Sequence, residues 1–450
     1  MTPALDYSAA LAALESRGRF GINLGLSRTR ALLAGLGHPE RSFRGALIGG
    51  TNGKGSVLAL VDSALRAAGY RVGETPKPHL VTYRERLQIA GEPVDTETFA
   101  RIATEVLALA DGVARRHGDP TEFELLTAMT FRWFADSNVD LAVGEVGLGG
   151  RLDATHAWDG GVAVITNVAL DHTDRLGNTV EAIAHEKAAI VMRGDLAVTG
   201  ASGGALDVIE RRCRRVAAPL TVAPPAPLLG LDRDGIDVEL GRLGRTRVGL
   251  RGRHQAANAA VADATLDALD ATGIATVGEG ARREGYATVR WPGRLELIEV
   301  AGREVLLDGA HNPAGAATLA TAIDDLTPFL RPGRATLVLA IMADKDVDGV
   351  IGALSRAAAF RDARVICTAP RGGRALPAGL LAARWEAATG RPAEGAANPR
   401  TALESALSTG SGPVFVAGSL YLVGAARAQL VDDPNLVPDP TISAAETQSR

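Results

Sequence analysis

The residues best suited to chemistry lie in a glycine-rich stretch that reads Gly-Thr-Asn-Gly-Lys-Gly-Ser from Gly50 to Ser56. Gly50, Gly53 and Gly55 leave room for backbone N–H groups to approach phosphate oxygens, and Lys54 supplies a positive charge for the β and γ phosphates. Ser56 offers a hydroxyl to a phosphate or to Mg²⁺. A plain turn between a strand and a helix is the competing interpretation. The lysine, the serine and the preceding apolar run together favour phosphate binding.

Polar residues also follow two later apolar runs. Glu145 ends the run that begins at Leu141, and a buried carboxylate is costly unless it is paired or binds a cation. Beside a phosphate loop the natural cation is Mg²⁺, although a structural salt bridge stays open as an alternative. Asp171 and His172 follow the next apolar run. We therefore consider His172 a candidate cation ligand or substrate contact.

For the remaining candidates, an ordinary structural role is also open. Lys187 lies in a helical stretch that turns apolar. Asp308 and His311 belong to a turn after an expected strand, which can present them to a ribose, a water molecule or an amino acid. Asn258 and Arg294 flank the expected domain boundary, and Arg294 could stabilise charge on a nucleotide phosphate.

Alternating strands and helices must position these residues. In the first part of the chain, strands are expected at 46–49, 141–146 and 161–168, and helices at 57–68, 123–134 and 179–191. After residue 290, strands are expected at 305–307, 335–341, 363–367 and 413–417. This alternation predicts the α/β class, with parallel sheets covered by helices on both faces. Such sheets place ligand groups at the carboxyl ends of their strands.

The bulk composition limits the possible functions. A chain of 450 residues predicts at least two domains, and the boundary is expected between Gly285 and Arg294, where Trp-Pro-Gly interrupts regular structure. The formal charge of −4 disfavours nucleic-acid binding. Two cysteines fit a reduced compartment, and neither a signal peptide nor a membrane-spanning run is visible. We expect a cytoplasmic protein that binds neither nucleic acid nor membrane.

Taken in order along the chain, these motifs resemble the folylpolyglutamate synthase and dihydrofolate synthase family, within the Mur ligase superfamily. The resemblance covers nearly the whole chain. Its motifs are GTNGKGS at 50–56, PHLV at 78–81, EVGLGGRLDAT at 145–155, EKA at 186–188, HQAAN at 254–258, WPGR at 291–294, DGAHNP at 308–313 and GSLY at 418–421.

The resemblance implies an organisation and a set of site residues. Residues 1–288 would form a Mur-ligase-type phosphate-loop ATPase domain with a parallel sheet, which also binds the acid substrate. Residues 289–430 would form a smaller Rossmann-like α/β domain that binds the amino acid, and 431–450 a disordered tail. The implied ATP contacts are Asn52, Gly53, Lys54, Gly55, Ser56, Asn258, Arg294 and Asp308. The implied Mg²⁺ ligands are Ser56, Glu145 and His172.

Further roles follow from the same resemblance. Lys187 matches a carbamylated lysine, whose anionic form can help hold a second Mg²⁺. Lys54, Lys187, His172 and Arg294 form the implied catalytic set. The acid substrate would contact Gly25, Leu26, Thr121, Phe123, Glu124, Arg151 and Asp153. His311 and Ser419 resemble positions near the incoming amino acid.

The implied reaction joins L-glutamate to the carboxylate of a folate or of dihydropteroate and consumes ATP, as part of folate biosynthesis and one-carbon metabolism. The carboxylate attacks the γ-phosphate to give an acyl phosphate, which the amino group of glutamate then attacks. Lys54, Arg294 and Mg²⁺ position the groups and neutralise charge. The expected partners are ATP, glutamate and a pterin-type acid, bound by a monomer.

Three residues depart from the family pattern. Lys77 stands where the family usually has a serine that ligates Mg²⁺, and an ammonium group repels a cation. His156 stands where the family favours asparagine, and Glu122 where an aromatic residue is common beside the pterin. Two alternatives therefore stay open: a paralogue that joins another acid or amine by the same chemistry in specialised metabolism, and a nucleotide-binding protein without catalysis.

Overall fold

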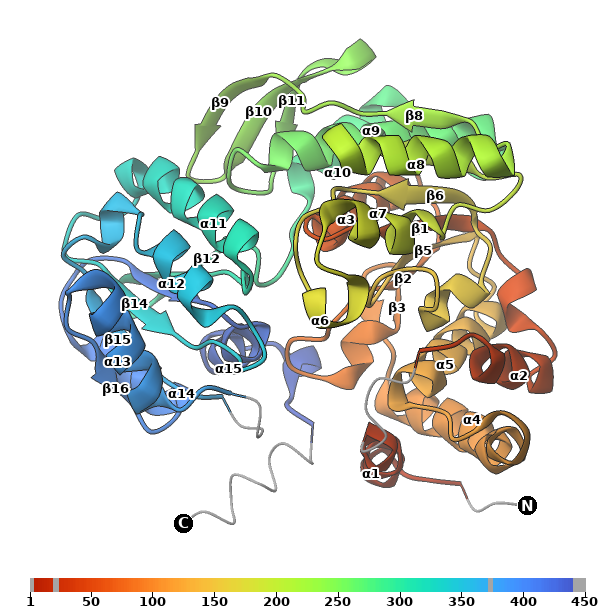
Figure 1. The fold of residues 1–450 in the computed structure, drawn as a ribbon, viewed down its shortest axis with the longest axis horizontal. Coiled ribbons are helices and arrows are strands. Elements are labelled where there is room, and N and C mark those ends of the chain that lie inside the picture. The colour runs from red at the N-terminus through yellow and green to blue at the C-terminus, as the bar shows by residue number, and fades with distance from the viewer. Residues whose placement is uncertain (1–3, 19–23, 371–374, 440–450) are drawn as a thin grey trace. The chain divides into compact units, whose positions relative to one another are not determined.

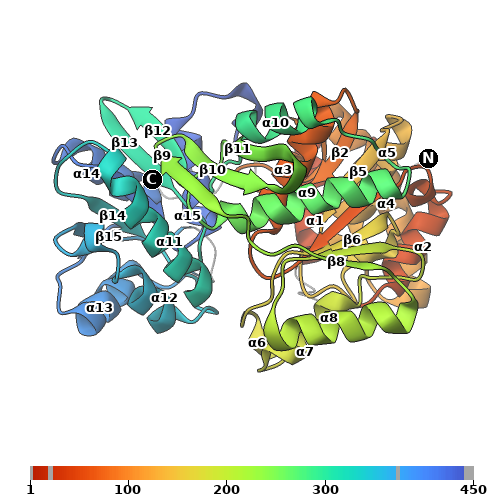
Figure 2. The same ribbon diagram turned by 90° about the horizontal axis from the view of Figure 1, so that it is seen from above.

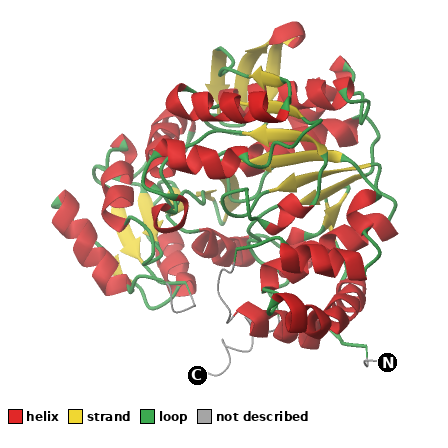
Figure 3. Ribbon diagram, turned by 45° about the vertical axis from the view of Figure 1, so that its right-hand side comes forward, coloured by secondary structure: helices red, strands yellow, loops and turns green. Residues whose placement is uncertain are grey.

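The computed structural model describes residues 4–18, 24–370 and 375–439. The chain divides into two compact units. Unit 1 comprises Met1–Pro225, Ala257–Tyr286 and Pro438–Arg450, and unit 2 comprises Ala226–Ala256 and Ala287–Val437. Figure 3 shows strands in yellow flanked by helices in red, which confirms the α/β class predicted from the sequence.

The described part of unit 1 holds an eight-stranded sheet. In spatial order its strands are β4 (Glu92–Pro93), β3 (Gln88–Ile89), β2 (Val72–Thr75), β5 (Leu141–Glu145), β1 (Gly45–Gly49), β6 (Gly161–Ile165), β7 (Leu196–Thr199) and β8 (Leu220–Val222). Strands β2, β5, β1, β6, β7 and β8 pair in parallel in this order. At one edge of the sheet, β3 pairs antiparallel with β2, and β4 pairs antiparallel with β3. All five residues of β1 are buried, as expected for a strand covered on both faces.

The helices of unit 1 are α1 (Tyr7–Gly18), α2 (Ser27–Gly35), α3 (Lys54–Ala67), α4 (Thr96–His117), α5 (Glu122–Asp136), α6 (Thr173–Leu176), α7 (Val180–Ala188), α8 (Gly203–Val216), α9 (Gln255–Ala271) and α10 (Glu279–Thr288). Helices α1, α2, α4 and α5 pack side by side (Figure 1). None of the helices described here is long and apolar enough to span a membrane.

Aromatic side chains fasten α5 to the sheet of unit 1. Phe43 contacts the rings of Phe131, Phe134 and Trp158, with centroids 5.6–5.9 Å apart. Trp158 is almost fully buried, and its indole N–H donates to the carbonyl oxygen of Phe43 at 3.3 Å. A large aromatic ring that also satisfies its polar atom stabilises a core strongly. These few aromatic contacts therefore hold α5 in its position. The first turn of α5 lies beside the site described below.

The described part of unit 2 contains two sheets. The six-stranded sheet has the order β12 (Glu296–Val300), β13 (Arg303–Leu307), β17 (Val414–Ala417), β14 (Thr336–Leu339), β15 (Arg364–Cys367) and β16 (Glu394–Gly395). The smaller sheet is antiparallel and consists of β11 (Gly244–Val248), β10 (Gly235–Leu240) and β9 (Leu228–Asp232). The helices are α11 (Pro313–Leu326), α12 (Val347–Leu354), α13 (Ala378–Thr389), α14 (Pro399–Ser408) and α15 (Leu420–Leu430).

The small sheet is grouped differently from the domain bounds expected from the sequence. Those bounds put residues 226–256 in the first domain, whereas in the structure these residues belong to unit 2. Figure 2 shows β9, β10 and β11 side by side. Arg233, in the turn after β9, bonds to Glu299 in β12 and to Glu304 in β13, and so links this sheet to the six-stranded sheet of unit 2. Such ion pairs depend on tertiary contacts, which leave no trace in the local sequence.

Part of the tail that was expected to be disordered lies within the described residues. A short 3-10 helix covers Pro434–Leu436, and the Asp439 side chain is buried. Asp439 accepts hydrogen bonds from the Tyr7 hydroxyl at 2.5 Å, the Thr82 hydroxyl at 2.8 Å and the Tyr83 amide at 2.9 Å. Residues 440–450 lie outside the described part.

Candidate active site

The phosphate loop joins β1 to α3, as the sequence predicts. Helix α3 begins at Lys54, so Ser56 lies inside its first turn and is not its first residue. Gly53 adopts a φ of 83°, and a Cβ there would collide with the side-chain oxygen of Asn258. Gly50 has a φ of 141°, and a Cβ there would collide with the Thr166 hydroxyl. Both glycines are therefore required by backbone conformation and by close packing.

The segment that follows β6 holds the loop from one side. The Asn52 amide donates to Oδ1 of Asn167 at 2.9 Å, and the Thr51 amide donates to the Asn167 carbonyl oxygen at 2.9 Å. The Thr166 hydroxyl donates to the Asn52 carbonyl oxygen at 2.6 Å. Thr166 and Asn167 are thus supporting residues to which the sequence analysis gave no role. Their only sequence signal is their place directly after a buried strand.

Lys54 and Glu145 meet beside this loop. Nζ of Lys54 donates to the Thr51 carbonyl oxygen at 3.1 Å and lies 3.9 Å from Oε1 of Glu145. The Glu145 side chain is 5% exposed and that of Lys54 is 17% exposed. The alignment of β1 with β5, in which Ile48 is opposite Glu145, brings them together. The structure therefore places the predicted phosphate lysine next to the predicted metal ligand.

Lys77 also reaches Glu145. Its Nζ donates to the Glu145 carbonyl oxygen at 2.6 Å, and its amide donates to Oε2 of the same residue at 2.9 Å. The ammonium group lies 5.1 Å from the centre of the Phe123 ring. Burial lowers the pKa of Lys77 to about 8, although Asp153 and Glu145 act in the opposite direction. The departure from the family pattern therefore lies inside the site.

Lys187 projects from α7 to the backbone of the phosphate loop. Its Nζ donates to the Gly50 carbonyl oxygen at 2.9 Å, and the residue is 5% exposed. Burial lowers its pKa to about 7, and the nearby charge of Lys54 contributes in the same direction. A lysine with such a pKa is largely a neutral amine above neutral pH. This is the protonation state in which an amine acts as a nucleophile.

Two of the three predicted metal ligands are Ser56 and His172. No group of three or more His, Cys, Asp or Glu residues among the described residues could hold a metal ion. Ser56, on α3, is buried. His172 precedes α6 with a φ of 49°, and its Nε2 lies 3.8 Å from a carboxylate oxygen of Asp171. These donors suit a divalent cation whose other ligands come from nucleotide phosphates and water.

Two of the predicted acid-substrate residues build the start of α5. The Thr121 hydroxyl accepts from the Glu124 amide at 3.3 Å, and the Glu124 carboxylate accepts from the Thr121 amide at 2.8 Å. Nε of Arg28 in α2 donates to both carboxylate oxygens of Glu124 at 2.9 and 3.0 Å. All three residues are buried. Their contacts account for a structural role, and their role in substrate binding stays a prediction.

Other predicted acid-substrate residues lie nearer to the lysines. The Phe123 ring contacts Lys77, and its edge lies where a side chain on Gly147 would be. Asp153 accepts from the amides of Gly147 and Leu148 at 3.0 and 2.9 Å. Phe123 therefore lies beside the Lys77 ammonium.

Three further residues from that group lie on surrounding segments. Gly25 and Leu26 precede α2 and are half-buried. Nε of Arg151 donates to Glu186, which precedes Lys187, at 2.9 Å. Their substrate contacts remain predictions.

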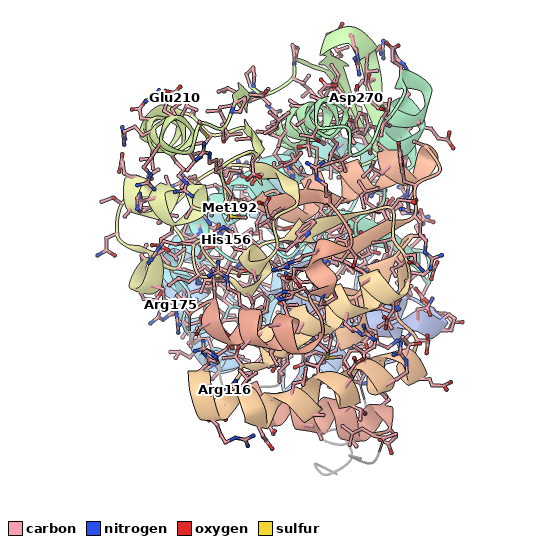
Figure 4. All side chains as sticks on the ribbon, turned by 90° about the vertical axis from the view of Figure 1, so that its right-hand side faces the viewer. Arg116, His156, Arg175, Met192, Glu210 and Asp270 are labelled. Carbon is pink, nitrogen blue, oxygen red and sulfur yellow. The ribbon has the colours of Figure 1, made fainter. Side chains whose placement is uncertain are left out.

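His156, labelled in Figure 4, is a second departure from the family pattern and is buried. Its Nδ1 lies 3.2 Å from the Arg151 carbonyl oxygen, and Nε2 has no hydrogen-bond partner within the described residues. Burial lowers its pKa, so the ring is neutral at pH 7. The third departure, Glu122, bonds to the Tyr83 hydroxyl.

Unit 2 carries the remaining predicted residues. Asp308 follows β13, and its carboxylate accepts from the amides of Leu295 and Ala310 at 3.0 and 2.8 Å. Burial raises the pKa of Asp308, while the charge of Arg294 opposes that shift. Nη1 of Arg294 donates to the Gly293 carbonyl oxygen at 3.2 Å. Arg294 and Asp308 therefore belong to one local cluster.

The two residues predicted to bind the amino acid follow neighbouring parallel strands. His311 comes shortly after β13, with Nδ1 2.8 Å from the Gly309 carbonyl oxygen. Ser419 follows β17 and begins α15, where its hydroxyl accepts from the Tyr421 amide at 3.2 Å. Because β13 pairs in parallel with β17, both residues lie beyond the carboxyl ends of neighbouring strands. Ser419 is nearly fully buried and also has a structural role as a helix cap.

Comparisons with known proteins identify the family of this chain. Residues 48–201 match the family model described as the Mur ligase middle domain, and residues 293–420 match the one described as the Mur ligase, glutamate ligase domain. A dihydrofolate synthase/folylpolyglutamate synthase from Mycobacterium tuberculosis is 35% identical over an alignment 456 residues long, which covers 92% of this chain and 91% of the relative.

Solved structures show the same likeness. Mycobacterium tuberculosis folylpolyglutamate synthase complexed with ADP and AMPPCP has a TM-score of 0.85 at 33% identity, covering 95% of this chain and 100% of that one. A bifunctional folylpolyglutamate synthase/dihydrofolate synthase with Mn, AMPPNP and L-glutamate bound has a TM-score of 0.80 at 29% identity, covering 96% and 100%. This chain belongs to the folylpolyglutamate synthase/dihydrofolate synthase family of Mur ligases.

Proposed function

We propose that this protein is an ATP-dependent ligase that adds L-glutamate to the carboxylate of a folate or of dihydropteroate. The observation that carries the proposal is the pair Lys54 and Lys187, both held on the backbone of the phosphate loop. In a chain of this family, such an arrangement suits activation of a carboxylate by ATP. Relatives over nearly the full length bear the names of these two activities.

In the first step, the acid's carboxylate oxygen forms a bond to the γ-phosphorus, and the bond between that phosphorus and the β–γ bridging oxygen breaks. ADP leaves, and the product is an acyl phosphate. The amino nitrogen of glutamate then forms the amide bond, phosphate leaves, and the nitrogen loses a proton. No enzyme nucleophile takes part, so the protein contributes mainly positioning and charge neutralisation.

The side chains divide these tasks. Backbone groups of Gly53–Ser56 and the Lys54 ammonium bind the β and γ phosphates, and Asn258 lies against Gly53. Arg294 and Asp308 are proposed to contact the nucleotide, and His311 and Ser419 to contact glutamate, as the family resemblance implies. Mg²⁺, when bound, would neutralise phosphate charge, with Ser56 and His172 as its proposed protein ligands. Glu145, the third ligand that the family resemblance implies, is bonded to Lys77 instead.

Lys187 is proposed to act as a carbamate. A neutral amine attacks CO₂: an N–C bond forms, one C–O π bond opens, and the nitrogen loses one proton to solvent, which converts the neutral amine into an anion. The lowered pKa of Lys187, about 7, supports this step because the amine is available near neutral pH. The carbamate oxygens would then help to hold a divalent cation near His172.

The decisive experiment measures ADP release with Mg²⁺-ATP and glutamate against a panel of acids. Release with dihydropteroate or tetrahydrofolate, with a glutamylated product in the mass spectrum, is the expected result. Release with other acids alone would replace the folate substrate. Nucleotide binding without turnover on the whole panel would refute the ligase proposal.

A second candidate is the same ligation with a different carboxylic acid or amine. The observation in its favour is that the Lys77 ammonium lies 5.1 Å from the centre of the Phe123 ring, which puts a positive charge beside a residue predicted to contact the acid substrate. The acid panel separates the two candidates directly.

We also propose that the protein works as a monomer in the cytoplasm. Cys213 and Cys367, both buried and unpaired, suit a reducing compartment.

A further inference from the structure

Lys77 bonds to Glu145 through its side-chain ammonium and through its backbone amide. Its ammonium donates to the Glu145 carbonyl oxygen at 2.6 Å, and its amide donates to carboxylate oxygen Oε2 at 2.9 Å. The alignment of β2 with β5, in which Thr75 is opposite Gly144, brings the start of the Lys77 loop to the end of β5. The position of the ammonium group is therefore fixed by the backbone of the central sheet.

A second lysine lies near the Glu145 carboxylate. Nζ of Lys54 lies 3.9 Å from Oε1 of Glu145, whose side chain is 5% exposed. Two ammonium groups thus lie beside Glu145 in a poorly solvated place, that of Lys77 at its carbonyl oxygen and that of Lys54 near its carboxylate. A divalent cation that used Glu145 as a ligand would also have to approach the Lys77 ammonium, and repulsion between like charges is strong where water is scarce.

The Lys77 side chain has little freedom to move aside. Its ammonium lies 5.1 Å from the centre of the Phe123 ring, which attracts a cation. Among the residues that the structure describes, no group of three or more acidic, His or Cys side chains could hold a metal ion.

Lysine is rare in this chain. Only four of its 48 lysine and arginine residues are lysines, at positions 54, 77, 187 and 345. Three of these four lie against the phosphate loop or Glu145. A lysine presents a compact, single-point charge, whereas an arginine presents a broad planar group. The compact charge of a lysine ammonium can therefore occupy a position that a metal ion would otherwise occupy.

We propose that the Lys77 ammonium is a built-in cation of the nucleotide site. It takes the place of a divalent cation beside Glu145, so the chain binds its nucleotide with a single divalent cation. The proposal rests on the proposed function, because it assumes that a nucleotide occupies the phosphate loop. Lys77 would then neutralise charge where the γ-phosphate and the acid's carboxylate meet, without depending on the metal concentration.

The test counts bound Mn²⁺ ions, because a solved relative holds Mn together with AMPPNP. The full-length chain, saturated with AMPPNP, is titrated with Mn²⁺ while electron paramagnetic resonance measures the free ion. We expect one Mn²⁺ per chain for the wild type and two for Lys77→Ser, whose neutral hydroxyl can ligate a cation. Lys77→Arg keeps the charge and is expected to stay at one.

A second pair of variants locates the additional ion. Glu145→Gln is expected to leave the count at one in the wild-type background and to lower it from two to one in the Lys77→Ser background. Two ions in the wild type would overturn the proposal, and so would a Lys77→Ser variant that melts normally but still binds one. If that variant does not fold, the wild-type count decides by itself. The count requires no turnover, so it can be read even if the acid panel refutes the folate substrate.

Discussion

At the scale of single residues, Lys187 is a lysine of the phosphate site whose pKa is lowered to about 7, mainly by burial. Its amine is buried, close to Lys54, and bonded to the Gly50 carbonyl oxygen. We expect Lys187→Gln to lower the rate of ADP release by at least about a hundredfold, because a catalytic carbamate then cannot form. A matched Lys345→Gln variant should retain the wild-type rate.

Added short carboxylic acids distinguish a lost carbamate from lost packing. They should partly restore activity to Lys187→Ala, because a carboxylate replaces the carbamate in the space left by the side chain. They should not change the activity of Lys345→Gln. A Lys187→Gln variant with near wild-type activity would contradict the assignment.

The same residue should make stability depend on pH. The pKa of Lys187 falls from its usual 10.5 to about 7 in the folded state, mainly through burial. Between these pH values the unfolded chain binds more protons than the folded chain, so the free energy of unfolding rises with pH. The rise attributable to Lys187 is on the order of 3 kcal/mol between pH 7 and pH 10.

Urea titrations in CO₂-free buffer at several pH values measure this rise. Lys187→Met removes the titrating group, so its free energy of unfolding should increase less with pH than that of the wild type. Parallel pH curves for the two proteins would show that the burial of Lys187 carries no such cost.

The pair Arg28 and Glu124 yields a separate prediction about stability. Both side chains are buried, and Nε of Arg28 bonds to both carboxylate oxygens. Removing one partner leaves a buried charge without its counter-ion, which costs about 3–5 kcal/mol. We expect Arg28→Met alone to destabilise strongly and Arg28→Met with Glu124→Gln to destabilise less. Thermal and urea unfolding check this, and additive losses in the double variant would contradict it.

These residues also show why the sequence could not separate substrate contacts from structural ones. Thr121 and Glu124 belong to a motif that the family resemblance connects with the acid substrate, yet their side chains hold the start of α5. Glu85 accepts from the amides of Leu80, Val81 and Thr82 and so shapes the loop after Lys77. Hydrogen bonds of this kind depend on where distant residues lie in space, which a motif does not specify.

At the scale of elements, the junction between β1 and α3 depends on Gly53. Its φ of 83° strains any residue with a side chain, and a Cβ would collide with Asn258. We expect Gly53→Ala to weaken AMPPNP binding at least tenfold, as measured by calorimetry. Gly37→Ala is the matched control, because Gly37 has a φ of 80° and open space around its Cβ position.

The control should lose only about 1 kcal/mol of stability through backbone strain and keep its nucleotide affinity. Equal effects of the two substitutions on AMPPNP binding would contradict the role of the contact with Asn258.

The strands and helices expected from the sequence are present, with shifted ends. The helix expected at 57–68 covers Lys54–Ala67, and that expected at 179–191 covers Val180–Ala188. Apolar runs predict strands reliably because both faces of these sheets are buried. Helix ends are harder to predict because capping contacts decide them, such as the Thr179 hydroxyl that accepts from the Ala182 amide.

At the scale of the whole molecule, the chain returns to unit 1 near its C-terminus. Asp439 accepts bonds there from Tyr7, Thr82 and Tyr83. We expect Asp439→Asn to destabilise by about 2 kcal/mol, since hydrogen bonds to a buried charge contribute more than neutral ones. The exposed Asp432→Asn makes the same charge change and should have no effect. Urea unfolding of both variants is the measurement, and equal stabilities would show that the Asp439 contacts are unimportant.

The sequence by itself determined the α/β class, the phosphate loop and the family, because these depend on local patterns of apolar residues, glycines and motif order. Tertiary structure alone decided that residues 226–256 group with unit 2. It also decided that Lys54 and Lys77 face Glu145 while Lys187 bonds to the phosphate loop. The alignment of β1, β2 and β5 and the packing of α7 set those distances, and they join residues that lie far apart in the chain.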